Sequence, residues 1–475
     1  MRAVSMPTSE RPAPQLLTGW GRTAPSATTV VEHRFDDVAG LGRRLRHLSP
    51  RGAIARGLGR SYGDSAQNGG GAAITIAPGP GCDDEAPIVF DHQARTVTAS
   101  AGVGLDDLLR VSVPLGLFVP VTPGTRFVSV GGAIASDIHG KNHHVEGTFA
   151  NHVRSLQLLL ADGSAVDVSR SQDPELFWAT VGGMGLTGVI LRATFAMLPI
   201  ETSRCRVDTE RAADLDTLMH LMSTGDHTFR YSVAWIDLLA RGASLGRSVL
   251  TRGDHARVEE LSPREAVDPL GYRPRRLVSV PPLIPRRGVL NHATVAAFNE
   301  FWFRAAPQRR IAEVMAVAKF FHPLDAISQW NRLYGRSGFL QYQFVVPFGE
   351  ETALRHVIER LATSGTASFL AVLKRFGAAN LAPLSFPTAG WTLALDIPAR
   401  AAGLAELLVE LDDVVLGAGG RHYLAKDSAT TPAAIRRGYP RLGEWQDVRD
   451  RVDPHHRWIS DQSRRLRLTE RIEDL

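Results

Sequence analysis

The stretch near the N-terminus with the clearest chemical potential is rich in glycine. Residues 55–64 read Ala-Arg-Gly-Leu-Gly-Arg-Ser-Tyr-Gly-Asp, with three glycines in seven residues. Glycine lets a backbone take positive φ and approach a ligand closely. Successive N–H groups in such a loop can form a nest for a pyrophosphate, and Arg60 can add positive charge. A tight loop between strands would need the same glycines, so this segment alone leaves both interpretations open.

A second glycine-rich segment spans residues 124–141. Its Gly-Gly pair at 131–132 begins a run of small residues, a pattern that can bring a helix N-terminus against a phosphate. Three histidines lie between positions 139 and 144. No carboxylate or cysteine accompanies them at ligand spacing, so we do not expect a metal site.

The third segment, residues 182–188, contains the spacing G-x-G-x-x-G. In a nicotinamide-binding Rossmann motif such glycines follow a strand and begin a helix. Here a helical pattern at 173–181, with Asp173 suited to the cap and Pro174 to the first position, precedes the glycines. A strand pattern at 188–198 follows them. Nicotinamide binding is therefore rejected, and the three segments together suggest a dinucleotide held by loops.

Lysine is rare in this chain and could mark sites that need an amine. It occurs only at positions 141, 319, 374 and 426, so the 54 basic residues less four lysines leave 50 arginines. Where only positive charge is needed, the chain uses arginine. A retained lysine is therefore a mild hint of a compact ammonium, or of an amine able to lose its proton. Chance is the alternative explanation.

The elements that must position these residues can be read from hydrophobic periodicity and turn signals. Besides the helix at 173–181 and the strand at 188–198, we expect helices around 38–48 and 105–113 and strands at 95–101, 153–160 and 165–169. After about residue 201 glycine becomes rarer and the patterns lengthen. Residues 253–290 are rich in proline and arginine and predict a long mobile loop. This loop could contact an acidic lipid surface or simply be solvated.

Length and composition limit the class of protein. A chain of 475 residues is too long to fold around one ordinary hydrophobic core, so two domains are expected. No window reaches the roughly 18 apolar residues of a membrane span, and residues 1–14 lack the apolar region of a secretory signal peptide. The net charge of +5, without basic runs among aromatics, argues against nucleic acid. Cys82 and Cys205 match no metal or redox spacing.

The motifs together resemble the vanillyl-alcohol-oxidase (PCMH) type of FAD-binding domain. The patterns are R-G-x-G-x-S, P-G…G-G…H-G, A-D-G and E-L-F-W…G-G-x-G-x-x-G, over roughly residues 28–201. Four stretches narrow the resemblance to the actinobacterial family of decaprenylphosphoryl-ribose oxidases, over nearly the whole chain: 56–71, 131–144, 339–344 and 423–428. Ala394 stands where mycobacterial members carry a cysteine, so inhibitors that need a thiol there are not expected to bond covalently.

The resemblance implies an α+β fold of two domains, in which the FAD domain is split in sequence around an inserted substrate domain with an antiparallel sheet. The fall in glycine content and the longer hydrophobic patterns after about residue 201 agree with such an insertion. The predicted divisions are a disordered leader (1–27), the first part of the FAD domain (28–202), the substrate domain (203–420) and a C-terminal return to the FAD domain (421–475).

The resemblance also implies an FAD-dependent oxidoreductase acting on CH–OH groups. Arg60 stands where many relatives carry a histidine bonded to the flavin, so the FAD should be non-covalent. The implied reaction oxidises the 2-hydroxyl of decaprenylphosphoryl-ribose to a keto sugar, the first step of epimerisation to lipid-linked arabinose for cell-wall arabinan. The implied partners are a keto-sugar reductase, quinone or oxygen as electron acceptor, and the cytoplasmic or periplasmic face of a membrane. The alternatives are an alditol or aldonolactone oxidase, or a non-catalytic lipid-sugar-binding subunit.

The resemblance assigns candidate site residues. Lys426 and His139 are the catalytic candidates, since either could take the hydroxyl proton: Lys426 if its pKa falls from about 10.4, His139 almost without tuning. Lys426 could instead stay charged, polarise the substrate oxygen and stabilise the anionic reduced flavin. His139 could equally only pack on the flavin. The candidate substrate-binding residues are Tyr62, Lys141, Gln341, Gln343 and Lys374; the two glutamines alternate on a predicted strand and so face the same side. The candidate cofactor-binding residues are Ala55, Arg56, Gly57, Leu58, Gly59, Arg60, Ser61, Tyr62, Gly63, Asp64, Gly124, Ser129, Val130, Gly131, Gly132, Ser136, Asp137, Ile138, His139, Ile190 and Tyr423.

Overall fold

The structure is a computed structural model that describes residues 13–34, 37–45, 49–77, 86–274, 278–286, 288–366 and 368–471. Its strands are β1 (Gln15–Leu17), β2 (Ser26–Arg34), β3 (Ala53–Ala55), β4 (Ala72–Ala77), β5 (Ile88–Asp91), β6 (Thr96–Ser100), β7 (Leu117–Phe118), β8 (Val153–Leu159), β9 (Ala165–Ser169), β10 (Val189–Ala196), β11 (Leu198–Pro199), β12 (Arg204–Ala212), β13 (Tyr231–Ile236), β14 (Ser248–His255), β15 (Val278–Ser279), β16 (Arg309–Ala316), β17 (Ile327–Ser328), β18 (Phe339–Pro347), β19 (Ala371–Phe376), β20 (Gly390–Pro398) and β21 (Arg421–His422). Its α-helices are α1 (Val38–Leu45), α2 (Leu105–Ser112), α3 (Val130–Ala135), α4 (His143–Glu146), α5 (Pro174–Thr180), α6 (Leu215–Gly225), α7 (His292–Ala305), α8 (Val317–Phe321), α9 (Glu351–Ser364), α10 (Leu404–Gly417), α11 (Pro432–Gly438), α12 (Leu442–Val452) and α13 (Asp461–Arg465).

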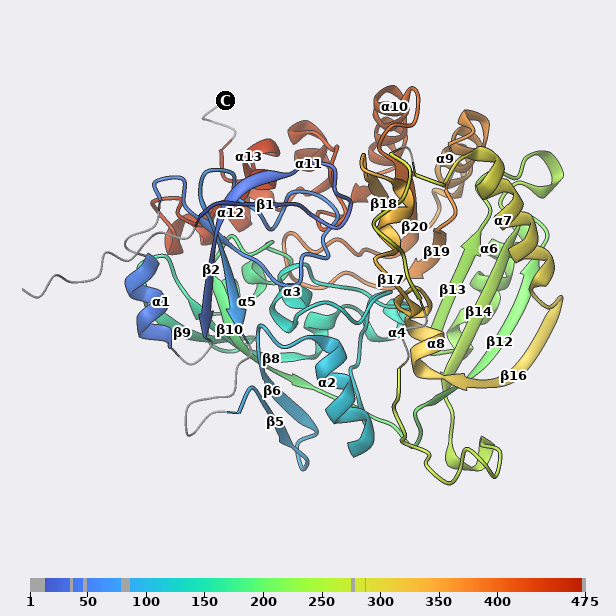
Figure 1. The fold of residues 1–475 in the computed structure, drawn as a ribbon, viewed down its shortest axis with the longest axis horizontal. Coiled ribbons are helices and arrows are strands. Elements are labelled where there is room, and N and C mark those ends of the chain that lie inside the picture. The colour runs from blue at the N-terminus through green and yellow to red at the C-terminus, as the bar shows by residue number, and fades with distance from the viewer. Residues whose placement is uncertain are drawn as a thin grey trace, which may run out of the picture.

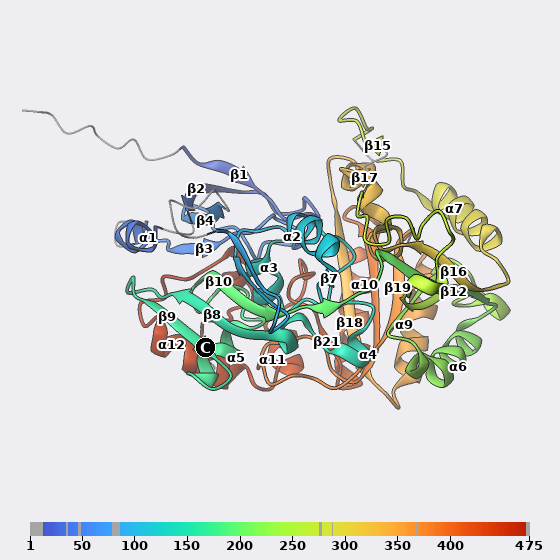
Figure 2. The same cartoon turned by 90° about the horizontal axis from the view of Figure 1, so that it is seen from below.

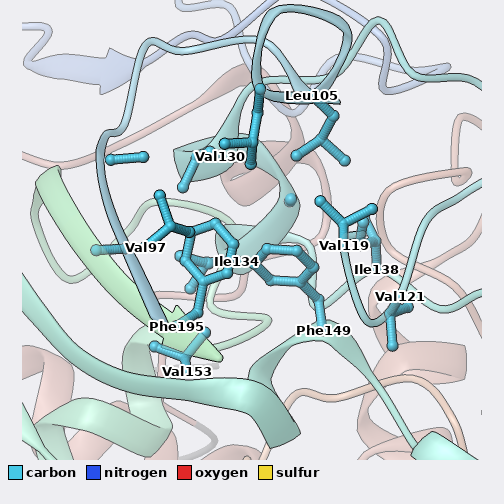
Figure 3. Close-up of a cluster of buried hydrophobic side chains, with 14 of the residues drawn as sticks. Val97, Leu105, Val119, Val121, Val130, Ile134, Ile138, Phe149, Val153 and Phe195 are labelled. Carbon is cyan, nitrogen blue, oxygen red and sulfur yellow. The ribbon is translucent and has the colours of Figure 1, made fainter. Parts of the chain in front are cut away.

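The first 200 residues form the two-stranded sheet β11-β7 and two further sheets of four and five strands (Figure 1). The smaller, in the order β1-β2-β4-β3, is parallel apart from β1. The larger, in the order β5-β6-β10-β8-β9, is antiparallel. Figure 3 shows the buried cluster beside it, where Val130 and Ile134 of α3 meet Val97 and Phe195 of the sheet. This packing fixes α3, around which the glycine-rich segments lie.

An antiparallel sheet of eight strands forms the other side of the molecule (Figure 1), in the order β16-β12-β14-β13-β19-β20-β18-β21. One of its faces is apolar: Leu340, Phe344 and Leu393 belong to a buried cluster with residues of α6, α9 and α10. Because neighbouring residues in a strand point to opposite faces, the residues between them, Gln341 and Gln343, lie on the other face. That face carries the polar residues of the candidate site.

The C-terminal helices lie beside the first part of the chain, as Figures 1 and 2 both show. Trp445 of α12 is fully buried, and its indole N–H donates to the Ala179 carbonyl of α5 at 3.0 Å. Ala53 of β3 exchanges backbone hydrogen bonds with residues 457 and 459. We propose that this arrangement reflects the two-domain organisation expected from the sequence, with the ends of the chain in one domain.

Most of the elements expected from the sequence are present. The strand expected at 165–169 is β9, and α5 begins at Pro174 with the Asp173 carboxylate accepting the N–H of Leu176 at 3.2 Å. The third glycine segment lies between α5 and β10. This order confirms that it lacks the Rossmann context. The α+β class is confirmed as well.

Two expectations are wrong in part. The disorder expected up to residue 27 is wrong for residues 15–27, because β1 pairs with the start of β2 and Trp20 N–H donates to the Ser61 carbonyl at 2.8 Å. The loop expected from residue 253 begins later, because Gly253 pairs with Val207 and Tyr231 inside the sheet. Residues 1–12, 46–48, 275–277 and 287, and Cys82, lie outside the described residues.

Candidate active site

The three glycine-rich segments meet at α3. An ideal Cβ on Gly57 would lie 2.2 Å from the Ser129 hydroxyl, so only glycine permits this approach. That hydroxyl caps α3 by accepting the N–H of Gly132 at 3.2 Å. At the other end of α3, Gly182 N–H donates to the Ile134 carbonyl and Met184 N–H to the Ala135 carbonyl. The first and third segments are therefore held against the start and the end of one short helix.

The first segment offers free donors to an anion. Among the described residues, the backbone N–H groups of Gly57, Leu58, Gly59 and Ser61 donate no hydrogen bond. Gly59 has a φ of +65°, the left-handed conformation that favours glycine. The guanidinium of Arg60 lies 4.0 Å from the centre of the Trp20 ring. Such a row of unpartnered N–H groups fits the pyrophosphate of a dinucleotide.

The polar face of the eight-stranded sheet lies opposite the first glycine-rich segment. Gln341 of β18 is directly across from Asp396 of β20, Gln343 from Ala394, and Lys374 of β19 from Thr392. The amide of Gln341 donates to the Asp396 carboxylate at 2.5 Å and to the Tyr62 hydroxyl at 3.2 Å. The two parts of the chain therefore meet through polar side chains.

His139 lies between this face and α3. Its ring is in contact with the rings of Phe376, Phe386 and Tyr423. Its Nε2 is 3.1 Å from the amide nitrogen of Gln343, and its Nδ1 is 3.0 Å from Nζ of Lys374. Burial, with the positive charge of Lys374, holds the pKa of His139 well below its usual 6.5. The ring is therefore neutral at physiological pH.

The partners of His139 determine where its single proton lies. A neutral imidazole has one N–H and one accepting nitrogen. Because the Gln343 amide N–H faces Nε2, the ring proton belongs on Nδ1, where an uncharged Lys374 amine can accept it. Burial and the charges of Lys426 and Lys141 lower the pKa of Lys374 from 10.5 to about 7. Near neutral pH, His139 and Lys374 can therefore both be uncharged, with the ring proton donated to the amine.

Lys426 lies in the turn after β21. Its Nζ is 4.0 Å from the centre of the Tyr62 ring, and Tyr62 N–H donates to the Ala425 carbonyl at 3.0 Å. Burial lowers the pKa of Lys426 from 10.5 to about 8, and nearby Asp396 opposes the change. Burial also raises the pKa of Asp396. Lys426 can therefore hold or release a proton at moderate pH. The charges of Lys426 and Asp396 each favour the charged form of the other group.

The structure brings together most of the predicted substrate and catalytic residues. Direct contacts connect Tyr62 with Gln341 and Lys426, and His139 with Gln343, Lys374 and Tyr423. Lys141 is close enough to lower the pKa of Lys374, but its own Nζ donates to the Phe320 carbonyl. Three of the four lysines therefore lie in this region, whereas Lys319 is exposed on α8.

Other predicted cofactor residues support the loops. Arg56 donates to the carbonyls of Ala66 and Thr18, and Asp64 pairs with Arg465. Tyr423 donates to the Ser136 carbonyl at 2.7 Å, and buried Asp137 accepts from Ser385 and Asn380. Val130, Ile138 and Ile190 are buried in the core, and Gly124 has open space where a Cβ would be.

Two ionisable residues of the site were not predicted from the sequence. Asp396 contacts Gln341, and Arg465 joins the loops that carry Tyr62 and Lys426. The alternation of Thr392, Ala394 and Asp396 against buried leucines could have placed Asp396 on the polar face. Nothing in the sequence pattern indicates Arg465, because its partners are about 400 and 38 residues away.

Comparison with known proteins agrees with this geometry. Residues 52–169 match the family model described as an FAD binding domain. With the loop-built cradle and the α+β fold, this defines an FAD-dependent oxidoreductase. The decaprenylphosphoryl-beta-D-ribose oxidase of Mycolicibacterium smegmatis is 45% identical over 467 residues, covering 98% of this chain and 100% of the relative. The chain therefore belongs to the decaprenylphosphoryl-β-D-ribose oxidase family.

Matches to other oxidoreductases are partial. An alditol oxidase of a Streptomyces species is 31% identical over 149 residues, which covers 31% of this chain and 34% of the relative. Cytokinin dehydrogenase 4 of Arabidopsis thaliana is 27% identical over 178 residues, which covers 36% of this chain and 34% of the relative. The alternative of an alditol oxidase therefore has much weaker support.

Proposed function

We propose that this chain oxidises the 2-hydroxyl of a polyprenyl-phosphoryl-β-D-ribose to the 2-keto sugar. The observation that carries the proposal is the polar sheet face with two amides and Lys374, beside Lys426, in a chain similar over 98% of its length to a decaprenylphosphoryl-β-D-ribose oxidase. When bound, FAD supplies the two-electron acceptor for the alcohol. The residues of the chain must orient the sugar and take the hydroxyl proton.

We assign the proton transfer to Lys426. Its lowered pKa leaves part of the amine uncharged near neutral pH, whereas both nitrogens of His139 already face partners in Gln343 and Lys374. Gln341 and Gln343 are the candidates for binding sugar hydroxyls, because each amide offers donors and an acceptor. Lys374 is the candidate for the phosphate, since a nearby anion would raise its pKa and keep it protonated.

The product implies partners. A keto sugar needs a separate reductase to become the epimer, and the reduced cofactor needs quinone or oxygen as an electron acceptor. A lipid-linked substrate also places the enzyme at a membrane face. Among the described residues, no helix has the length and apolar character needed to cross a bilayer.

The visible absorption spectrum of the purified protein tests the proposal. Anaerobic addition of polyprenyl-phosphoryl ribose should bleach the flavin bands, whereas free ribose and alditols should leave them unchanged. Bleaching by alditols, without bleaching by the lipid-linked sugar, would contradict the proposal and favour the alditol oxidase. A colourless protein that cannot be loaded with FAD would point to the non-catalytic alternative.

A further inference from the structure

Helix α7 carries aromatic side chains on its exposed surface. Val295 and Asn299 are buried, and Asn299 donates to the Asp237 carboxylate at 2.7 Å, which anchors this side of the helix to the eight-stranded sheet. Phe298, Phe301 and Trp302 are 37%, 69% and 46% exposed. We call these three residues the α7 aromatic face. A globular protein normally turns such a stripe inward, so this face indicates a partner.

The chain around α7 is strongly basic. Between residues 271 and 311 the sequence has eight arginines and one acidic residue, Glu300. This segment therefore carries a formal charge of +7, more than the net +5 of the whole chain. Glu300 forms ion pairs with Arg247 and Arg304, so the only acidic group of the segment is already neutralised. A partner for this region is expected to be anionic.

Aromatic contacts connect the α7 aromatic face with the candidate active site. Phe298 stacks on Trp302 and meets Phe369, with ring centres 5.9 Å apart in each pair. Phe369 contacts Tyr334, which stacks on Phe339 with ring centres 4.1 Å apart. Phe339 in turn meets the ring of Tyr62 at 5.4 Å. An apolar cluster therefore runs from the exposed helix to the residue beneath Lys426.

We propose that the α7 aromatic face docks on a membrane surface rich in anionic phospholipids. Helices that lie in a membrane interface combine tryptophan and phenylalanine with flanking cations, and tryptophan favours the level of the headgroups. Arginines near an anionic leaflet add attraction that salt weakens. The inference rests on the proposed function, because a lipid-linked substrate must reach Lys426 from such a surface.

Sedimentation with vesicles tests the docking. FAD-loaded full-length protein should pellet with vesicles of equal phosphatidylglycerol and phosphatidylcholine, and at least tenfold less with phosphatidylcholine alone. The variant Phe301→Ser/Trp302→Ser should lose at least tenfold in binding to the anionic vesicles. The matched control, Leu381→Ser/Val409→Ser, removes two side chains that are 63% and 59% exposed elsewhere and should bind like the wild type.

Three results would overturn the inference. The wild type would stay in the supernatant with anionic vesicles, or the α7 variant would pellet as well as the wild type. Alternatively, ultracentrifugation would show a dimer that the α7 variant abolishes, without vesicle binding, which would assign the face to a second copy. Flavin bleaching by detergent-solubilised substrate, measured on the same samples, separates the two proposals: bleaching without vesicle binding discards only the docking, and vesicle binding without bleaching discards only the proposed function.

Discussion

Lys374 and Lys426 have lowered pKa values for the same main reason, but the charges of their neighbours differ. Burial removes water from both ammonium groups. Lys374 also lies near two other lysines, which lower its pKa further, whereas Lys426 has Asp396 nearby to oppose the change. Lys374 therefore loses its proton at lower pH than Lys426. Near neutral pH the pair His139–Lys374 can be uncharged while Lys426 still titrates.

The rate of flavin bleaching by substrate should follow the protonation of Lys426. An amine accepts a proton only when it is uncharged, so the rate should rise with pH through about 8 and level off above it. Lys426→Met should lose roughly 10²–10⁴-fold in rate, the usual worth of a general base. The control Lys319→Met changes the exposed lysine on α8 and should bleach like the wild type. A wild-type rate that does not vary between pH 6 and 9 would contradict the assignment.

At the scale of elements, one arginine of α13 joins the two loops that carry Tyr62 and Lys426. Arg465 donates to both carboxylate oxygens of Asp64, at 3.0 and 2.7 Å, and to Asp427 at 2.7 Å. Asp427 also accepts backbone N–H groups of Ala429 and Thr430 and so shapes the turn after Lys426. Arg465 is therefore a positioning residue, which acts through Asp64 and Asp427.

Replacing Arg465 by glutamine should loosen the turn that holds Lys426. We expect the free energy of unfolding to fall by about 1–3 kcal/mol, the range for buried groups that lose a charged partner. Lys426 should become more hydrated, so its pKa and the midpoint of the pH–rate curve should both rise. The control Arg467→Gln removes an exposed ion pair with Glu470 and should change stability by less than about 0.5 kcal/mol. An unchanged midpoint in the Arg465 variant would show that the arginine is only structural.

The elements also show how far the sequence could predict the site. Periodicity and caps predicted β8, β9 and α5, and alternation placed Gln341 and Gln343 on one face, because these signals are local. The contact of Gln341 with Asp396 depends on β20 lying between β19 and β18, an order that local patterns do not encode. β1, with three residues, is too short to show a period. The outward aromatic face of α7 could not be predicted either, since apolar residues are normally assigned to the core.

At the scale of the whole molecule, the proposed cofactor site joins segments from both ends of the chain. The glycine-rich loop, α3 and the third glycine segment form the cradle, while the C-terminal segment supplies Lys426 and, through Arg465, the support of Asp64. A ligand that fills this cradle binds only the folded chain. Its binding free energy is therefore added to the stability of the fold.

FAD should consequently stabilise the protein in a concentration-dependent way. Arg60 cannot form the covalent flavin bond of its histidine counterparts, so acid precipitation should leave FAD in the supernatant and permit an apoprotein to be prepared. Adding FAD at 100 times its Kd should then stabilise the fold by about 2.7 kcal/mol and raise the Tm. Riboflavin lacks the pyrophosphate that the free N–H groups of Gly57, Leu58, Gly59 and Ser61 are suited to bind, so it should raise the Tm far less at equal concentration. Equal shifts for riboflavin and FAD would show that the first glycine loop does not hold the pyrophosphate, and flavin in the acid pellet would show a covalent bond elsewhere in the chain.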